Sequence, residues 1–247
     1  MSFALSVLKI GGSVLTGPDA YTRAAGFVAA RLRARAPERI LAVVSAELGV
    51  TDSLLATATS ITGNPDPGTL DLLWSTGELR SAALLALSLQ AAGIRAAAVN
   101  VHQTGLVDPS DAAVPGMSRL RPLRLRALLA VNDVEVAPGF LARGAGDRIV
   151  SLGRGGSDLT AVLLAAGLGA ARCELLKDVP GYFTADPKHD PEARPLESLT
   201  FSRAIAMADE GCELVQRQAL VAAREHGVQV LVSAMTGGTG TWVRADN

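Results

Sequence analysis

The chain has 247 residues, of which 49 % are hydrophobic and 19 % are charged, and its formal net charge at pH 7 is −1. One domain with a full core fits this composition, and the small net charge excludes a global field that would attract nucleic acid or an anionic membrane. Two widely spaced cysteines exclude a disulfide scaffold, and neither a signal peptide nor an apolar run of about 18 residues is evident, so we expect a cytoplasmic protein.

Strand and helix patterns alternate along the chain. In chain order we expect a strand at 4–10, a helix at 21–36, a strand at 39–45, a helix at 70–92, strands at 94–101 and 134–137, a hairpin-like pair through 144–152, a helix at 158–168, a strand at 172–177, helices at 200–208 and 213–225, and strands at 228–233 and 241–243. Such alternation predicts an α/β fold, a three-layer α/β/α sandwich with a mainly parallel central sheet. No linker divides the chain, so we expect one domain over residues 1–247.

A glycine pair follows the first expected strand, in the sequence Lys9, Ile10, Gly11, Gly12, Ser13. Two glycines let backbone N–H groups approach a phosphate closely, and the lysine adds a positive charge beside them. The loop is not a Walker A motif, because its lysine precedes the glycines. By itself the pattern also fits an ordinary turn between a strand and a helix.

A second glycine-rich loop, LGRGGSD, leads into the helix expected at 158–168. The N-terminus of a helix favours anions, and Arg154 in this loop can grip a carboxylate. Ser157 or Asp158 could serve only as a helix cap, which would still leave the glycines and Arg154 unexplained.

Further loops follow two other strands, with the sequences SAELGVTD and KDVPGYFTADPK. Loops at the carboxyl ends of parallel strands converge on one crevice. All three lysines of the chain, Lys9, Lys177 and Lys188, would meet there. A compact, mobile ammonium group suits phosphate chemistry.

Together, KIGGS, SAELGVTD, STGELRS, GRGGSD and KDVPGYFTADPK resemble the ordered motifs of aspartokinases within the amino acid kinase family, from Lys9 to the closing TGTWV. The resemblance implies ATP-dependent phosphorylation of the side-chain carboxylate of aspartate, with Mg²⁺ bridging the ATP phosphates. No protein-held metal site is expected. A substrate-side lobe would occupy about residues 1–145 and a nucleotide-side lobe about residues 146–247.

The resemblance also implies individual roles. Lys9 would contact the transferred phosphoryl group, surrounded by Gly11, Gly12 and Ser13, and Asp158 would orient the lysines. The resemblance implies that the substrate is bound by Thr51, Glu78 (ammonium), Arg154 (carboxylate) and Ser157. It implies that the nucleotide site is lined by Lys177, Asp178, Phe183 and Lys188.

The chain departs from the aspartokinase pattern in three ways. Glu213 stands where a lysine usually meets the nucleotide, and Gln216 and Arg217 replace histidine and proline. Only about 26 residues separate the GVTD and GEL motifs, which predicts a trimmed substrate lobe. The sequence also ends where aspartokinases usually continue into regulatory ACT domains, so no such domain is expected.

Two alternatives to an aspartate kinase remain open. The chain could phosphorylate another small substrate, or it could be a non-catalytic subunit that binds a nucleotide or an amino acid. Its partners would then still be small molecules, and homo-oligomers are possible by analogy with relatives.

Overall fold

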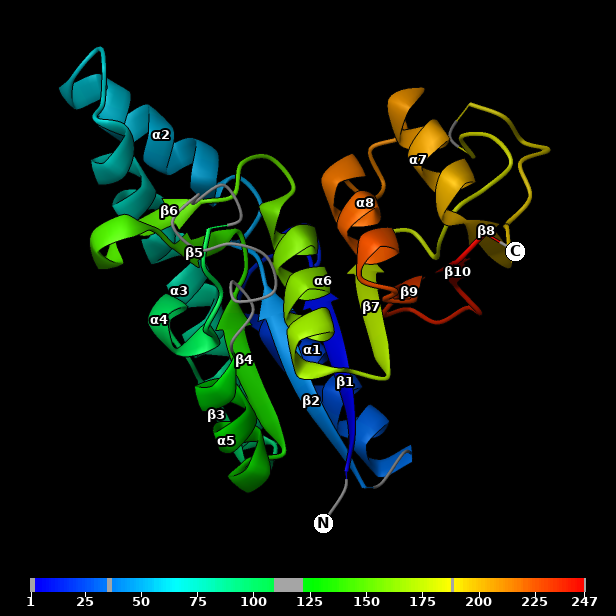
Figure 1. The fold of residues 1–247 in the computed structure, drawn as a ribbon, viewed down its shortest axis with the longest axis horizontal. Coiled ribbons are helices and arrows are strands. Elements are labelled where there is room, and N and C mark those ends of the chain that lie inside the picture. Colours follow the sequence, from blue (N-terminus) through cyan, green and yellow to red (C-terminus); the bar gives the residue numbers. More distant parts are fainter. Residues whose placement is uncertain (1–2, 35–36, 109–121, 188, 247) are drawn as a thin grey trace.

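A computed structural model of the chain describes residues 3–34, 37–108, 122–187 and 189–246 (Figure 1). Its strands are β1 Ala4–Ile10, β2 Glu38–Val44, β3 Ala96–Ala98, β4 Val134–Pro138, β5 Leu141–Arg143, β6 Ile149–Ser151, β7 Arg172–Lys177, β8 Ser198–Thr200, β9 Val230–Ala234 and β10 Thr241–Arg244. Its α-helices are α1 Pro18–Ala34, α2 Val50–Ile61, α3 Pro67–Ala91, α4 Val101–Thr104, α5 Leu123–Val131, α6 Gly156–Leu168, α7 Phe201–Asp209 and α8 Arg217–Glu225.

Eight of the described strands form one sheet in the order β3-β4-β2-β1-β7-β9-β10-β8. Every pair in it is parallel except β9 with β10. The central strand β1 is buried on both faces, which explains its almost uninterrupted apolar sequence. Strands β5 and β6 form a separate antiparallel pair, so a hairpin is present as expected, but its first strand begins at Leu141, before the expected 144–152.

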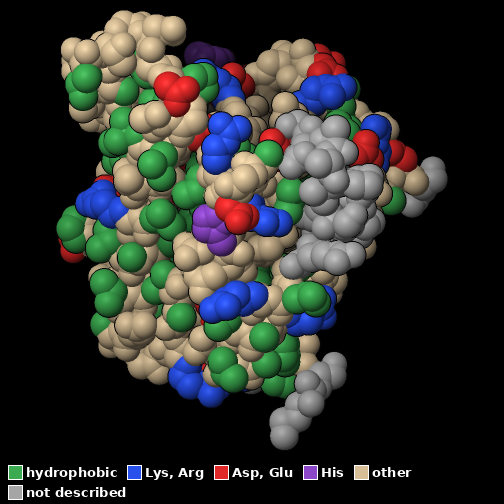
Figure 2. Space-filling view, turned by 60° about the vertical axis from the view of Figure 1, so that its left-hand side comes forward, with side chains coloured by type: hydrophobic (Ala, Val, Ile, Leu, Met, Phe, Trp, Pro, Cys, Tyr) green, Lys and Arg blue, Asp and Glu red, His purple; other side chains and the backbone are tan. Residues whose placement is uncertain are grey.

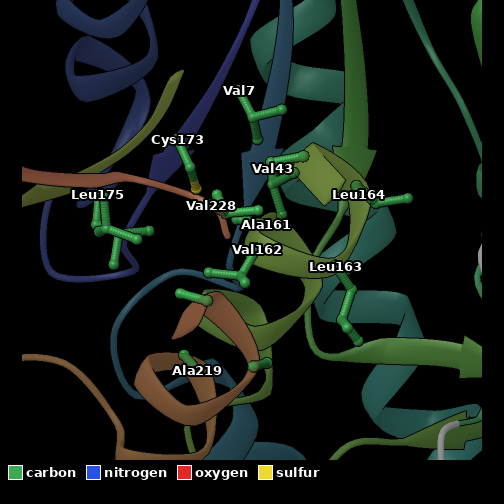
Figure 3. Packing of buried hydrophobic residues seen from close by; sticks show 14 of the residues in the cluster. Val7, Val43, Ala161, Val162, Leu163, Leu164, Cys173, Leu175, Ala219 and Val228 are labelled. Carbon is green, nitrogen blue, oxygen red and sulfur yellow. The ribbon is translucent and has the colours of Figure 1, made fainter. Parts of the chain in front are cut away.

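Alternate side chains of the central strands enter two hydrophobic clusters, one on each face of the sheet. Val7 and Leu175 pack with helices α6 and α8 on one face, as Figure 3 shows for this cluster. Leu8 and Leu176 pack with α1 and α3 on the other. Helices therefore cover both faces, and the predicted three-layer α/β/α fold is confirmed.

Some expected boundaries were wrong. The strand expected at 94–101 shortens to β3, because residues 101–104 turn into helix α4, whose start is capped by Asn100. The helix expected from Glu213 begins only at Arg217, since Gln216 before it is extended. Helix α2 is not among the expected elements, because the SAELGVTD motif at its start predicts a loop and no helix or strand is expected for the rest of it.

A buried carboxylate ties α1 to the sheet. Glu174 on β7 accepts a hydrogen bond from Ser233 Oγ at 2.7 Å, forms an ion pair with Arg31 of α1, and has Arg172 at 4.0 Å. The side chain of Glu174 is 3 % exposed and that of Arg31 is 15 % exposed. Breaking such a pair from one side leaves an uncompensated buried charge.

We therefore expect Glu174→Leu to lower the free energy of unfolding by about 3–5 kcal/mol, measured by urea denaturation. The control is Glu210→Leu, which removes an exposed pair with Arg203 and should change stability by less than about 1 kcal/mol. Equal losses in the two variants would contradict a structural role for the buried pair.

Candidate active site

The carboxyl ends of four strands meet at one edge of the sheet. Ile10 of β1 lies opposite Val44 of β2 and Leu176 of β7, and Val44 lies opposite Pro138 of β4. Strand β2, which follows β1 in the chain, lies on one side of β1, and the later strand β7 lies on the other. The order of the strands therefore changes direction at β1. Open α/β sheets bind ligands at such a position.

Asp158 forms the centre of this edge. Its Oδ1 lies 2.9 Å from Lys9 Nζ and its Oδ2 lies 2.8 Å from Lys177 Nζ. Burial by itself would raise the pKa of Asp158, but the two ammonium groups outweigh it and hold this pKa below its usual range. Burial, together with the charge of Lys9, lowers the pKa of Lys177 although Asp158 opposes the shift. The expected meeting of Lys9, Lys177 and Asp158 is confirmed.

The glycine pair after β1 is closely surrounded, and Gly12 has no room for a side chain. A Cβ on Gly12 would lie 2.3 Å from the carbonyl oxygen of Ala46, and one on Gly11 would lie 3.3 Å from Lys9 Nζ. The amide of Leu48 donates to Gly12 O at 3.2 Å. The loops after β1 and β2 are thus in direct contact, with Ser13 exposed at their rim.

The glycine-rich segment 153–158 starts helix α6 beside this pair. Its N-cap, Gly155, has φ 73° and provides no side-chain cap, so the first turn is left without a side-chain acceptor. Arg154 is exposed and Ser157 is buried. A Cβ on Gly139, after β4, would lie 2.7 Å from Ser157 Oγ, so only glycine fits there.

Glu78 of α3 lies at the same edge and is 4 % exposed. Burial raises its pKa to about 8, although an N–H of Ala46 and the charge of Lys9 oppose the shift. Its Oε2 is buried and accepts no hydrogen bond from the described residues. A buried acid left half-satisfied in this way has capacity for one more donor.

A polar network that the sequence did not reveal flanks Glu78. The hydroxyl of Tyr21 lies 2.9 Å from Glu47 Oε1 and 3.0 Å from Ser81 Oγ, and Arg80 pairs with Glu47 at 3.1 Å. Burial raises the pKa of Tyr21 to about 12. The sequence offered one signal of it: Glu47 stands within the SAELGVTD motif, and Arg80 and Ser81 stand within STGELRS.

The remaining expected residues are distributed as follows. Thr51 lies in the first turn of α2. Its neighbour Val50 packs against Gly77, the residue before Glu78: a Cβ on Gly77 would lie 3.0 Å from Val50 Cγ1. Asp178 is exposed directly after β7. Phe183 is half-buried, and its backbone forms an isolated antiparallel β-bridge with Pro195. Lys188 lies outside the described residues.

One of the three residues that depart from the aspartokinase pattern, Gln216, adjoins the glycine-rich segment. A Cβ on Gly155 would lie 1.8 Å from Gln216 Cγ, so the side chain of Gln216 covers this glycine. Arg217 binds Asp209 at 2.7 Å, and Glu213 is exposed in the segment between α7 and α8.

Within the described part of the chain, no three histidine, cysteine or acidic side chains gather as a metal site. No described helix combines the length and apolar character of a membrane span. On the face shown in Figure 2, basic and acidic side chains are scattered rather than gathered into a patch of one sign.

A mainly parallel α/β sheet that pairs two lysines with a buried aspartate at its switch point offers the kind of fixed positive charge that phosphate groups bind. The family model "Amino acid kinase family" matches residues 4–233. The chain belongs to the amino acid kinase family.

Aspartokinases are the relatives that this chain resembles. An aspartokinase of Thermus thermophilus is 36 % identical over 242 residues, which are 98 % of this chain and 59 % of the relative. The aspartate kinase from Synechocystis superposes with a TM-score of 0.86 and 33 % identity, covering 98 % of this chain and 40 % of that one. Escherichia coli aspartokinase III in complex with aspartate and ADP superposes with a TM-score of 0.83 and 26 % identity. The match covers 98 % of this chain and 65 % of that one. The chain thus spans about three-fifths of the length of its curated relative.

Glu78 makes stability depend on pH. The unfolded chain ionises this group near the ordinary pKa of 4.5, whereas the folded protein keeps the proton up to about pH 8. The folded state therefore binds more protons between these values, and its stability falls as the pH rises through them.

Glu78→Gln should abolish this loss. The difference in free energy of unfolding between the variant and the unmodified protein should grow in favour of the variant from about pH 5 to about pH 8.5. It should reach up to about 5 kcal/mol and then level off. Urea denaturation at several pH values measures it, with the exposed Glu197→Gln as control. A difference that does not vary with pH would contradict the shifted pKa.

Proposed function

We propose that this chain transfers the γ-phosphoryl group of ATP to the side-chain carboxylate of aspartate. The observation that carries the proposal is the pairing of Asp158 with both Lys9 and Lys177 at the switch point of the sheet. The similarity to aspartokinases over 98 % of the chain supports aspartate as the acceptor. The aspartate and ADP complex of the Escherichia coli enzyme supports the same pair of ligands.

The acceptor amino acid would lie between two opposite charges. Glu78 would receive the ammonium group, because its buried Oε2 accepts no hydrogen bond from the described residues. Arg154 would bind the α-carboxylate, since its guanidinium is exposed at the start of α6. Thr51 and Ser157 would complete the pocket with hydroxyl groups.

The nucleotide would approach from the side of β7 and α8. Lys9, with Gly11, Gly12 and Ser13, would hold the transferred phosphoryl group, and Lys177, Asp178, Phe183 and Lys188 would line the rest of the site. Mg²⁺ would enter bound to ATP, because it usually binds through substrate phosphates and water rather than a cage of side chains. The two free cysteines suit the reducing cytoplasm in which ATP is abundant.

The reaction needs positioning and charge neutralisation rather than a general base. The carboxylate of aspartate is already ionised at pH 7. One of its oxygens forms the new bond to the γ-phosphorus while the bond to the bridging oxygen of ADP breaks, and the electron pair leaves with ADP. Two ammonium groups fixed by Asp158 stabilise the charge on the transferring group without reorganising.

A coupled assay of ADP release against a panel of amino acids tests the proposal. Turnover with aspartate above all others supports it. Turnover with a different acceptor favours another small substrate, and ATP or amino-acid binding by calorimetry without turnover favours a non-catalytic subunit.

Exchanging Glu78 for Gln should raise the KM for aspartate about tenfold to a hundredfold, because a hydrogen bond to a charged group is lost. The KM for ATP should change little. In the unmodified protein the KM for aspartate should fall as the pH rises toward 8, since ammonium binding requires ionised Glu78, and the variant should lack this dependence. Equal effects on both substrates would contradict the assignment.

Glu213→Lys should tighten the binding of ATP with Mg²⁺ about fivefold, because a negative charge becomes positive at the position where aspartokinases usually carry a lysine that meets the nucleotide. Calorimetric titration at low and high salt measures it, and the gain should shrink at high salt. Glu210→Lys, which makes the same charge change at the end of α7, is the matched control. An equal gain in the control would mean that net charge, not position, is responsible.

A further inference from the structure

An aromatic pair joins the helix of Glu78 to the loop after β4. The rings of Trp74 and Phe140 meet edge to face, with centroids 5.9 Å apart and planes at 66°. Trp74 precedes Glu78 by four residues on α3, which places both side chains on one face of the helix. A shift of the Trp74 ring would therefore displace the helical turn that carries Glu78.

Phe140 also lies against the glycine-rich segment. A Cβ on Gly156 would be 3.1 Å from Phe140 Cδ2 and 3.2 Å from Phe140 Cα. The neighbouring Gly139 is in equally close contact with Ser157. Contacts therefore run without a gap from Trp74 through Phe140 to the first turn of α6.

Both aromatic residues are costly choices at their positions. Phe140 has φ 67°, a left-handed conformation that is unfavourable for a bulky side chain. The indole Nε1 of Trp74 is buried and has no hydrogen-bond partner among the described residues. Glycine at 140 and phenylalanine or leucine at 74 would build the same fold at lower cost. Two such costs at one contact indicate a demand beyond folding.

We propose that Trp74 is a positioning residue: through Phe140, it sets the separation between Glu78 and the glycine-rich segment, and thereby selects an acceptor of the length of aspartate. The inference rests on the proposed function, in which Glu78 holds the ammonium group and the segment of Arg154 and Ser157 holds the α-carboxylate. With both ends fixed, the length of the acceptor decides whether its side-chain carboxylate reaches the phosphoryl group at Lys9. Glutamate, one methylene longer, misplaces that carboxylate.

The experiment compares kcat/KM for aspartate with kcat/KM for glutamate. Trp74→Leu should lower this ratio about tenfold, which is within the range that one methylene contributes in a rigid pocket. The loss should appear mainly in the KM for aspartate, and the KM for ATP should stay within about twofold. Trp74→Phe keeps an aromatic edge but removes the unpaired N–H together with part of the fused ring, so it should retain more of the ratio than Trp74→Leu does.

Two further variants complete the design. Trp242→Leu makes the same substitution in β10, at the only other tryptophan, and should leave the ratio unchanged. Phe140→Gly relieves the left-handed strain, removes the ring, and should lower the ratio as Trp74→Leu does. It keeps the test decisive if Trp74→Leu does not fold.

An unchanged ratio in Trp74→Leu and Phe140→Gly would overturn the inference alone, provided that the unmodified chain phosphorylates aspartate. A ratio that falls equally in Trp74→Phe and Trp74→Leu would also overturn it, because the aromatic contact with Phe140 would then not be what sets the ratio. A fall in Trp242→Leu would assign the effect to general loosening. No turnover of aspartate by the unmodified chain would overturn the proposed function, and the inference with it.

Discussion

The carboxylate of Asp158, buried between Lys9 and Lys177, is the constraint on which the rest of this edge depends. A buried charge is tolerated only when it is paired. Here the pairing joins the carboxyl ends of strands β1 and β7 to the first turn of helix α6. This fixes three elements that are far apart in the sequence. It also fixes two ammonium groups before any ligand arrives, and such preorganisation is what transition-state charge requires.

The two buried carboxyl groups of the site, Asp158 and Glu78, have opposite protonation states at neutral pH. Two cations hold Asp158 ionised below its usual pKa, whereas burial leaves Glu78 protonated up to about pH 8. Groups whose pKa values are pushed apart by their surroundings mark distinct roles. Asp158 organises positive charge, and Glu78 keeps an unused acceptor in a place that a cationic group would complete. The difference arises from neighbours alone, since both side chains are almost fully buried.

Several local free-energy costs of the fold lie at this edge. Helices α3 and α7 begin with side-chain caps, at Asp66 and Thr200. Helices α2 and α6, which start at the site, begin at left-handed glycines without such caps. Phe140 adds backbone strain, and Trp74 adds an unpaired donor. Natural sequences accept local conflicts of this kind at functional sites and compensate for them in the core.

The sequence by itself determined the strands that carry the site and the loops that follow them, because a strand buried on both faces is apolar in any context and a glycine-rich loop needs its glycines locally. It also placed Lys9 and Asp158 together. Three other features emerge only from the folded structure: α8 begins after Gln216, whose side chain covers Gly155, Glu78 keeps its proton, and Trp74 meets Phe140. Each of these depends on which distant segments pack together. Burial, and the charges and rings that burial brings into contact, are properties of the folded chain and have no local pattern.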